Sequence, residues 1–452
     1  MKKKQLVKST SGIRGVVGNG LDPVMVSAYG AAFGTFLKKG KIVVGSDSRP
    51  SKDMVRRAVI AGLTAVGIDV IDVGVVPTPT VEIAVKKLKA AGGICITASH
   101  NPSPWNALKF FNKTGEFITP AQYQQLDKIF NSGNFAWRPV NKLGRVEYQD
   151  KWIDEHIKQT LAVKTVNKPA IKKRRFKVVV DAVNGAGSTA LPRLLEKLGA
   201  QVVCLNCNGD GNFVHEPEPI PENLKQLGRA VRKHRADLGL ACDPDADRLA
   251  LVDETGRAIG EEYTLGIAVR QVLKKIKGPT VINLSTSKAT ADIAAAAGSK
   301  VWLSRVGEAN VVELMRKKRG VIGGEGNGGV IFPSFHAGRD SLIAAALTLS
   351  CLAEEKISLK GLVEKLPKYY IIKSKAPLPD NFNRKLNAFE SEAKKLLGKT
   401  IIDRQDGLRF DFERGWVQLR SSNTEPIYRL IVETEDRQLT VKLHKAVKRY
   451  FK

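Results

Sequence analysis

Hydrophobic and polar positions follow one succession of patterns that occurs three times along the chain. Each copy opens with a short β-branched run, typical of a buried strand, in residues 41–45, 176–181 and 280–284. A stretch rich in Ala and Leu with helical spacing follows each run, as in residues 54–66. The chain is therefore predicted to contain a repeated strand–helix unit.

Each copy continues with a second strand and then a third, which ends in a polar loop. The second strands are predicted in residues 67–71, 199–203 and 298–302, and the third in residues 93–97, 237–240 and 321–323. Strands that alternate with helices form parallel sheets, and such sheets bind ligands beyond the carboxyl ends of their strands. We expect the three polar loops to face one cleft.

The last part of the chain departs from this repeat. It combines a helix in residues 381–397 with strands in residues 408–412 and 416–420. We therefore predict an α/β protein with three similar domains of mixed, mostly parallel sheets and a smaller C-terminal α+β domain, around a central cleft. The predicted domains cover residues 1–150, 151–255, 256–370 and 371–452.

The composition adds a strong positive charge to this picture. The chain has 452 residues, of which 73 are Lys or Arg and 45 are Asp or Glu, a formal net charge of +28. Basic surfaces bind nucleic acids, but this charge is spread over all four predicted domains. The basic runs in residues 172–175 and 316–319 contain no aromatic residues on which bases would stack. Nucleic-acid binding stays open as the alternative from another class, ranked below an enzyme.

Targeting and cysteine patterns point to a cytoplasmic protein without a membrane partner. The lysines at positions 2–4 are not followed by an apolar stretch, and the sequence contains no apolar run of about 20 residues. Five cysteines cannot all pair within a monomer. Cys204 and Cys207 form a lone Cys-x-x-Cys, for which two ordinary thiols outrank a zinc or redox site.

The sharpest candidate site is Asp-Pro-Asp-Ala-Asp-Arg, in which Asp243, Asp245 and Asp247 alternate with other residues. Pro244 disfavours a helix, so we expect an extended loop whose alternate side chains face one way. Clustered carboxylates repel one another unless a cation neutralises them, and Mg²⁺ prefers such oxygen ligands. An EF-hand is excluded because Arg248 stands where that loop needs a glycine. An acidic turn without a metal is the remaining alternative.

The loop Thr-Ala-Ser-His-Asn-Pro occupies the equivalent position in the first copy of the repeat. Taken alone it reads as an ordinary turn, and no Gly-x-Ser-x-Gly elbow supports a serine hydrolase. Beside a divalent cation, however, Ser99 could carry a phosphoryl group. Lys109 would then serve as proton acceptor or as a phosphate contact.

Two further loops favour a sugar phosphate as ligand. Residues 420–426, Arg-Ser-Ser-Asn-Thr-Glu-Pro, combine an arginine with hydroxyl groups and turn amides, which suits phosphate, although a plain turn explains them equally well. In the glycine-rich loop 323–329, Glu325 would repel phosphate, whereas Glu325 and Asn327 together suit sugar hydroxyls.

Taken together, these motifs resemble those of the α-D-phosphohexomutases over essentially the whole chain. The matching motifs, in family order, are Ser-Gly-Ile-Arg-Gly, Thr-Ala-Ser-His-Asn-Pro, Asp-Pro-Asp-Ala-Asp-Arg, Gly-Glu-Gly-Asn-Gly-Gly and Ser-Asn-Thr-Glu-Pro. The resemblance implies that Ser99 is the phosphoserine and that its phosphate, with Asp243, Asp245 and Asp247, holds Mg²⁺. It implies that the residues around the transferring group are Arg14, His100, Lys109 and Arg248. It implies that the sugar contacts are Gly307, Glu325 and Asn327. It implies that the contacts to the non-reacting phosphate are Arg420, Ser422, Asn423, Thr424 and Arg429.

The implied activity is that of an isomerase that moves a phosphoryl group between C1 and C6 of a hexose phosphate through a hexose 1,6-bisphosphate. Many family members carry Ser and His where this chain has Asn327 and Gly329, and Ser304 to Gly307 replaces a Thr-x-x-Gly. The Gly-Glu-Gly-Asn-Gly-Gly form resembles phosphoglucosamine mutases of the archaeal type. We therefore expect conversion of glucosamine 6-phosphate to glucosamine 1-phosphate, by a monomer or homodimer, with phosphomannomutase/phosphoglucomutase activity as the alternative.

Overall fold

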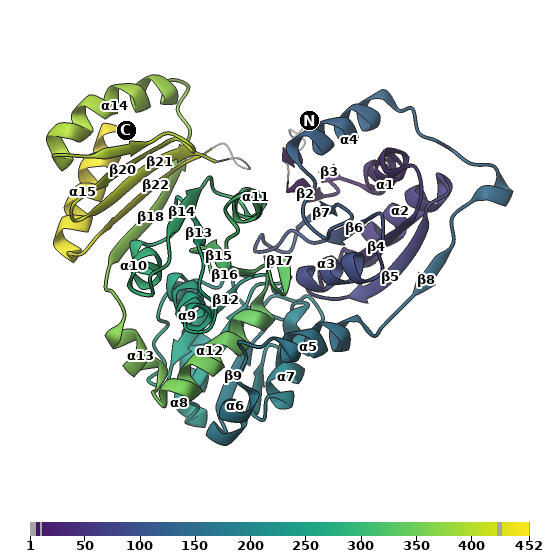
Figure 1. The fold of residues 1–452 in the computed structure, drawn as a ribbon. Helices are drawn as coiled ribbons and strands as arrows, with labels where there is room; N and C mark the ends of the chain where they lie inside the picture. The colour runs from purple at the N-terminus through teal and green to yellow at the C-terminus, as the bar shows by residue number, and fades with distance from the viewer. Residues whose placement is uncertain (1–5, 10, 423–426, 452) are drawn as a thin grey trace.

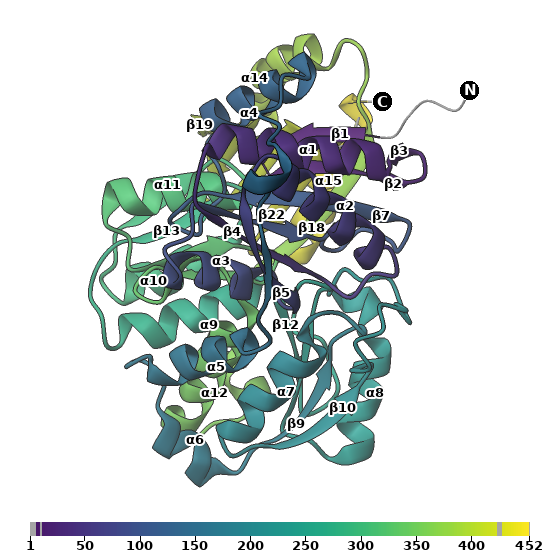
Figure 2. The same cartoon turned by 90° about the vertical axis from the view of Figure 1, so that its right-hand side faces the viewer.

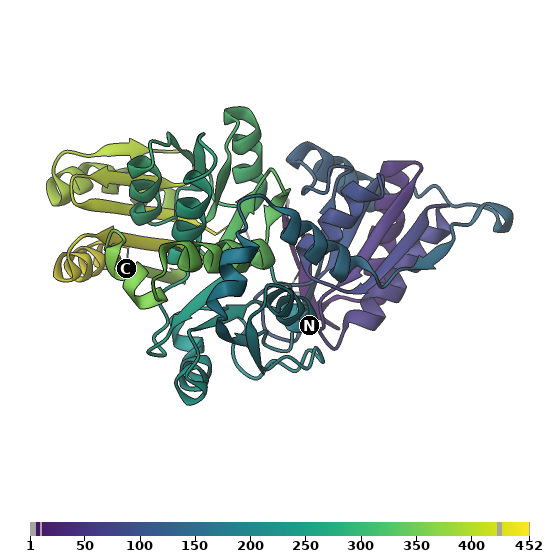
Figure 3. The ribbon, with the colours of Figure 1, turned by 60° about the horizontal axis from the view of Figure 1, so that its bottom comes forward.

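The computed structural model describes residues 6–9, 11–422 and 427–451, and it places them in four domains, each built around one sheet (Figure 1). Domains I to IV follow one another along the chain. Domains I and IV lie on opposite sides of the molecule, with domains II and III between them (Figures 1 and 3). The predicted architecture of three α/β domains and a smaller fourth is confirmed.

Domain I is a three-layer unit around a mixed sheet with the strand order β1-β2-β7-β6-β4-β5-β8, in which β3 also pairs with β2. Its strands are β1 (Leu6–Ser9), β2 (Gly12–Val17), β3 (Gly20–Leu21), β4 (Lys41–Ser46), β5 (Asp69–Val75), β6 (Gly92–Ile96), β7 (Trp105–Phe111) and β8 (Val146–Tyr148). Its helices are α1 (Pro23–Leu37), α2 (Lys52–Ala65), α3 (Thr78–Lys87), α4 (Pro120–Ser132) and the short 3-10 helix η1 (Val140–Lys142). Because successive strand side chains point to opposite faces, Val44 packs with α1 and α2, and Val43 packs with α3.

Domains II and III repeat this design with smaller sheets, ordered β10-β9-β11-β12 and β14-β13-β15-β16-β17. Domain II contains α5 (Trp152–Ala162), α6 (Lys168–Arg174), β9 (Lys177–Asp181), α7 (Gly187–Lys197), β10 (Gln201–Leu205), the 3-10 helix η2 (Pro221–Asn223), α8 (Lys225–His234), β11 (Leu238–Cys242) and β12 (Leu249–Asp253). Domain III contains α9 (Glu262–Leu273), β13 (Thr280–Asn283), α10 (Lys288–Ala296), β14 (Val301–Ser304), α11 (Glu308–Lys318), β15 (Ile322–Glu325), β16 (Gly329–Phe332), β17 (His336–Arg339), α12 (Ser341–Glu355) and α13 (Leu359–Lys365).

The repeat predicted from the sequence is confirmed strand by strand. The first strand of each copy, β4, β9 or β13, lies between the other two and pairs in parallel with both. The third strands, β6, β11 and β15, therefore end at the edge where parallel strands present their carboxyl ends. This arrangement sets the three polar loops at equivalent places in the three domains.

Helix α12 joins domains II and III into one body. Its first thirteen residues, 341–353, are all buried, and it packs against α9 of domain III as well as α5, α6 and α7 (Figure 2). One continuous apolar cluster includes Leu191 and Leu240 of domain II together with Leu265 and Leu347 of domain III. A helix that is apolar on all sides is buried, which is the position α12 occupies.

Domain IV is an antiparallel sheet, ordered β18-β22-β21-β20-β19, covered by two helices. Its elements are β18 (Tyr370–Pro377), α14 (Phe382–Leu397), β19 (Ile401–Asp403), β20 (Leu408–Phe412), β21 (Gly415–Ser421), β22 (Ile427–Thr434) and α15 (Arg437–Tyr450). Among the helices in the described ranges, none is long and apolar enough to span a membrane.

Candidate active site

Ser99 follows β6 and meets the aspartate loop of domain II. Its backbone has the left-handed φ of 50°, and its N–H donates to Thr97 Oγ1 at 2.9 Å. Its carbonyl oxygen accepts a hydrogen bond from the buried Arg49 guanidinium. The Ser99 hydroxyl donates to Asp243 Oδ2 at 2.7 Å. The two loops singled out from the sequence therefore meet across the boundary between domains I and II.

The aspartate loop is a tight turn between the antiparallel strands β11 and β12, so the expected extended conformation was wrong. The N–H of Ala246 donates to the carbonyl of Asp243 at 2.9 Å, and Ala246 has a φ of 52°. Asp243 Oδ1 also accepts the N–H groups of Asp247 and Arg248, both at 3.2 Å. Turn geometry, rather than alternation along a strand, brings the carboxylates together.

The three carboxylates fit a divalent cation. One oxygen each of Asp243, Asp245 and Asp247 lies within 4.8 Å of the others, and all three side chains are buried. Within the described part of the chain, Asp245 Oδ1 and Asp247 Oδ1 accept no hydrogen bond. Burial and then the two neighbouring carboxylates raise the pKa of Asp243 well above its usual range. Buried, mutually repelling oxygens without donors are the ligand set that a hard cation stabilises.

Lys109 on β7 reaches into the same cluster. Its Nζ lies 2.6 Å from Asp245 Oδ2 and 3.3 Å from Asp247 Oδ2. Burial alone would lower the pKa of Lys109, but the two carboxylates raise it. The sequence left two roles open for Lys109, proton acceptor or phosphate contact. A protonated Lys109 is better suited to contact a phosphate.

His100, Arg14 and Arg248 complete the surroundings of Ser99. His100 Nδ1 lies 3.4 Å from Ser99 Oγ. Burial, followed by the positive charges of Arg248 and Arg14, lowers the pKa of His100 well below its usual range, so the imidazole is neutral at pH 7. Arg248 pairs with Glu218 at 3.5 Å, and Arg14 donates to the side chain of Asn101, two residues beyond Ser99.

The loop expected to contact the sugar is organised around Glu325, the last residue of β15. Glu325 Oε1 accepts from Asn283 Nδ2 at 2.7 Å and from the N–H of Gly307 at 2.9 Å. Gly307, with a φ of 115°, is the N-cap of α11. The side chain of Asn327 accepts the N–H of Gly329 at 3.1 Å. The structure thus brings Gly307, Glu325 and Asn327 together in domain III.

The loop expected to hold the second phosphate follows β21 in domain IV. Arg420 on β21 lies directly opposite Arg429 on β22. Burial and the charge of Arg429 lower the pKa of Arg420. Guanidinium groups bind phosphate through charge-assisted hydrogen bonds, so two neighbouring arginines suit a phosphate that both can contact. Ser422 follows the strand, whereas Asn423 and Thr424 lie outside the described residues.

Sequence reasoning missed several polar residues that support the site. Arg49 also donates to the carbonyl oxygens of Asn101, Pro102 and Trp105, and so holds the whole serine loop. Thr78 Oγ1 donates to Asp245 Oδ2 at 2.6 Å. For Arg49 the available signal was the polar run 46–49, which begins at the last residue of β4 and lies at the same sheet edge as the recognised loops.

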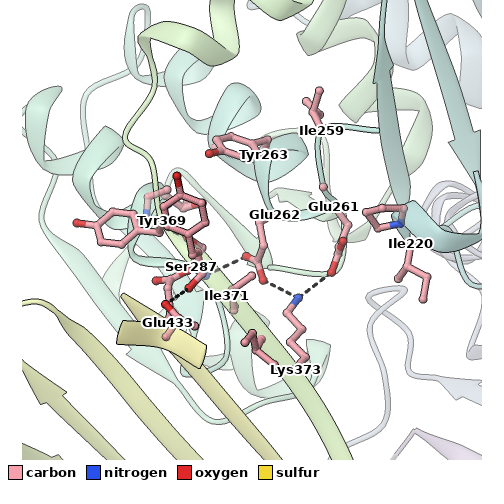
Figure 4. A pocket seen from close by; sticks show the side chains of 18 of the residues that line it. Ile220, Ile259, Glu261, Glu262, Tyr263, Ser287, Tyr369, Ile371, Lys373 and Glu433 are labelled. Carbon is pink, nitrogen blue, oxygen red and sulfur yellow. Dashed lines mark hydrogen bonds and ion pairs between the residues drawn. The ribbon is translucent and has the colours of Figure 1, made fainter. Parts of the chain in front are cut away.

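A separate cavity of about 620 Å³ lies where domains III and IV meet, and residues 220–222 of domain II also line it (Figure 4). Of the described residues that line it, none is a site residue predicted from the sequence. Lys373 of β18 lies 2.8 Å from Glu261 Oε1 and 2.7 Å from Glu262 Oε1, and it donates to the carbonyl of Gly326 at 3.2 Å. The strand that leads into domain IV is thereby tied to the sugar loop of domain III.

Family models match nearly the whole chain, in the order of its four domains. The first three describe phosphoglucomutase/phosphomannomutase, alpha/beta/alpha domains I, II and III, and match residues 5–137, 154–256 and 261–370. The fourth, for the C-terminal domain of the same enzymes, matches residues 374–449.

Individual proteins agree with this match. A "Phosphoglucomutase/phosphomannomutase" of Thermococcus kodakarensis is 38% identical over 95% of this chain and 94% of its own length. A "Probable phosphoglucosamine mutase" of Pyrococcus abyssi is 36% identical over 95% and 94%. The crystal structure of a phosphoglucomutase/phosphomannomutase family protein from Burkholderia thailandensis is 28% identical, with a TM-score of 0.85 over 97% of this chain and 95% of that one. The chain therefore belongs to the α-D-phosphohexomutases, the isomerases of the phosphoglucomutase/phosphomannomutase family.

Proposed function

We propose that this phosphohexomutase interconverts glucosamine 6-phosphate and glucosamine 1-phosphate through a phosphoserine at Ser99. The contact that carries the proposal is the 2.7 Å hydrogen bond from Ser99 Oγ to Asp243, within a buried set of three aspartates. A relative called "Probable phosphoglucosamine mutase" supports the choice of glucosamine phosphate as the substrate. The 38% identical "Phosphoglucomutase/phosphomannomutase" favours mannose and glucose phosphates as the second candidate substrates.

In the proposed reaction, the bond between Ser99 Oγ and phosphorus breaks as a bond forms between phosphorus and a free sugar hydroxyl at C1 or C6. The neutral His100 imidazole, 3.4 Å from Ser99 Oγ, accepts the proton that this hydroxyl loses and passes it to Ser99 Oγ, the leaving group, which becomes the free serine hydroxyl. The resulting 1,6-bisphosphate turns round, and the other phosphate returns to Ser99. Mg²⁺ held by Asp243, Asp245 and Asp247 would neutralise the charge of the transferring group.

The remaining loops hold the sugar in line with Ser99. Glu325 and Asn327 would bind its hydroxyls, and the Arg420–Arg429 pair would bind the phosphate that is not reacting. Lys109 and Arg248 would contact the transferring phosphoryl group. Fixing both ends of the substrate supplies the positioning on which phosphoryl transfer depends.

The deciding experiment compares kcat/KM for the 1-phosphates of glucosamine, mannose and glucose with one enzyme preparation. We expect the highest value for glucosamine 1-phosphate. A higher value for mannose or glucose 1-phosphate would reverse the order of the two candidates. Removal of divalent cations with a chelator should abolish turnover in every case, and Mg²⁺ should restore it.

Replacing Ser99 with Ala removes the proposed phosphoryl carrier. We expect the activity of S99A to fall by at least about four orders of magnitude, as for other enzymes that lose a nucleophile. The melting temperature should change little, and Ser103→Ala in the same loop is the matched control. Substantial turnover by S99A would exclude Ser99 as the phosphoserine.

A further inference from the structure

Arg339, the last residue of β17, links three buried carboxylates from separate segments. Its Nη2 donates to Asp247 Oδ2 at 2.6 Å, and its Nη1 donates to Glu325 Oε2 at 2.8 Å. Its Nε donates to Oε2 of Glu308, in the first turn of α11, at 2.9 Å. The Arg339 side chain is 9% exposed. One rigid guanidinium therefore touches both the aspartate loop of domain II and the sugar loop of domain III.

Gly329 leaves the space through which the Arg339 side chain passes. A Cβ at position 329 would lie 2.3 Å from Arg339 Cδ and 3.0 Å from its Cγ. The backbone of Gly329 is outside the left-handed region, so its conformation alone would admit any residue. The stem of Arg339 and the nearby Asn327 Oδ1, 3.0 Å from that Cβ, are what keep position 329 without a side chain.

We propose that Arg339 is a positioning residue that couples cation binding at the aspartate loop to sugar binding at Glu325. The inference rests on the proposed function, because it requires both ligands. The guanidinium is planar and its donors are fixed relative to one another, so it cannot change its bond to Asp247 without changing its bond to Glu325. Both carboxylates are buried, so the loss of the guanidinium leaves a buried charge that lacks one of its partners.

The expected coupling is positive. A cation that takes up the charge of Asp247 weakens the hold of Asp247 on Arg339. The guanidinium is then held more firmly by Glu325 and Glu308, which orders the sugar loop before the sugar arrives. Coupling between two sites is reciprocal, so a hexose phosphate must tighten cation binding by the same factor. We expect a factor of about five or more, within the usual range for coupled sites.

The test uses the dephosphorylated enzyme, which cannot turn over a hexose monophosphate. The dissociation constant of Mn²⁺, read by electron paramagnetic resonance, is measured with and without saturating glucosamine 6-phosphate. In the wild type the sugar phosphate should lower this constant about fivefold. The coupling is given by the ratio of the Mn²⁺ dissociation constant without glucosamine 6-phosphate to that with it. In Arg339→Lys and Arg339→Met this ratio should approach one. Arg270→Met, which removes a bidentate pair with Glu355 outside the site, is the matched control and should keep the wild-type ratio.

The outcomes separate this inference from others. If Arg339 served stability alone, its variants would melt at a lower temperature and bind both ligands more weakly, but the ratio would stay at the wild-type value. That result would overturn the inference. If the wild type bound no hexose phosphate, the proposed function would fail instead.

A second variant keeps the test decisive if Arg339→Met does not fold. Gly329→Ala leaves all three carboxylates in place and displaces chiefly the Arg339 stem, the nearest side chain to the added Cβ, with Asn327 Oδ1 next at 3.0 Å. It should reduce the ratio in the wild type and have no further effect in Arg339→Lys. A wild-type ratio in both Gly329→Ala and Arg339→Lys would overturn the inference.

Discussion

Ser99 occupies a backbone conformation that a serine adopts only when its surroundings hold it there. A φ of 50° costs a non-glycine residue roughly 1 kcal/mol or more, and such strain is common at functional sites. Here the buried Arg49 opposes the strain through four carbonyl oxygens of the loop, while Asp47 fixes Arg49 at 2.9 Å. The position of the Ser99 hydroxyl therefore depends on a residue fifty positions away.

Replacing Arg49 with Lys tests this dependence. Lysine keeps the charge but cannot donate to four carbonyl oxygens at once, so the serine loop should shift. We expect kcat to fall about 100-fold, the effect of a misplacement of about 1 Å, with a smaller change in KM. Arg57→Lys, at an exposed position of α2, is the control and should leave both parameters unchanged. An unchanged kcat in Arg49→Lys would show that the loop holds its own conformation.

At the same scale, the sequence showed the residues that belong to compact motifs and missed those that reach the site from elsewhere. The three aspartates stand in a short run that by itself predicts a metal site, and Ser99 was identified from that neighbouring site and from the family motifs. Arg49, Thr78 and Arg339 belong to none of the recognised motifs, and their roles become clear only from long-range contacts. The roles of the predicted residues in catalysis stay predictions until variants are measured.

At the scale of elements, strands and helices were predictable wherever a local period marked them. The three parallel units follow from alternating β-branched and helical patterns, and β20 has the predicted bounds. Helix α12 has no polar face, so its sequence does not reveal which helices it joins. The turn at Asp243 was misjudged because the tight pairing of β11 with β12 is a tertiary property.

The start of α10 offers a pH test at this scale. Glu262 accepts the N–H of Ser287, the N-cap of α10, at 2.9 Å and pairs with Lys373. Burial raises the pKa of Glu262 to about 7, above its ordinary 4.5, despite the opposing charge of Lys373. Its contribution to stability is thus fully present below about pH 4.5 and is lost as the pH rises through 7.

We therefore expect the stability of Glu262→Gln to increase relative to that of the wild type as the pH rises. Between pH 5 and pH 8, the difference in free energy of unfolding should move in favour of the variant by at most about 3 kcal/mol. Chemical denaturation of both proteins at several pH values measures this drift. Glu222 and Glu262 both line the cavity shown in Figure 4, but Glu222 is exposed, so Glu222→Gln is the control. A difference that does not vary with pH would mean that Glu262 stays ionised throughout.

At the scale of the whole molecule, we expect the net charge of +28 to affect how fast the substrate arrives rather than how it reacts. Hexose phosphates are anions, and a basic surface raises the rate of their encounter. We expect kcat/KM to fall about threefold as the ionic strength rises from about 0.02 to 0.5 M, because salt screens surface charges. Initial rates at low substrate measure this. The value of kcat should change little, and a kcat/KM independent of salt would argue against steering.

The core shared by domains II and III has a consequence for substrate choice. Because α12 and its neighbours form one packed body, we expect the distance between the aspartate loop and Glu325 to stay constant during the reaction. In the proposed reaction the sugar must fit this distance twice, once in each orientation. A hexose that fits in only one orientation would pass the first half-reaction and then stall as its bisphosphate. Selectivity would then appear as accumulated intermediate as well as weak binding.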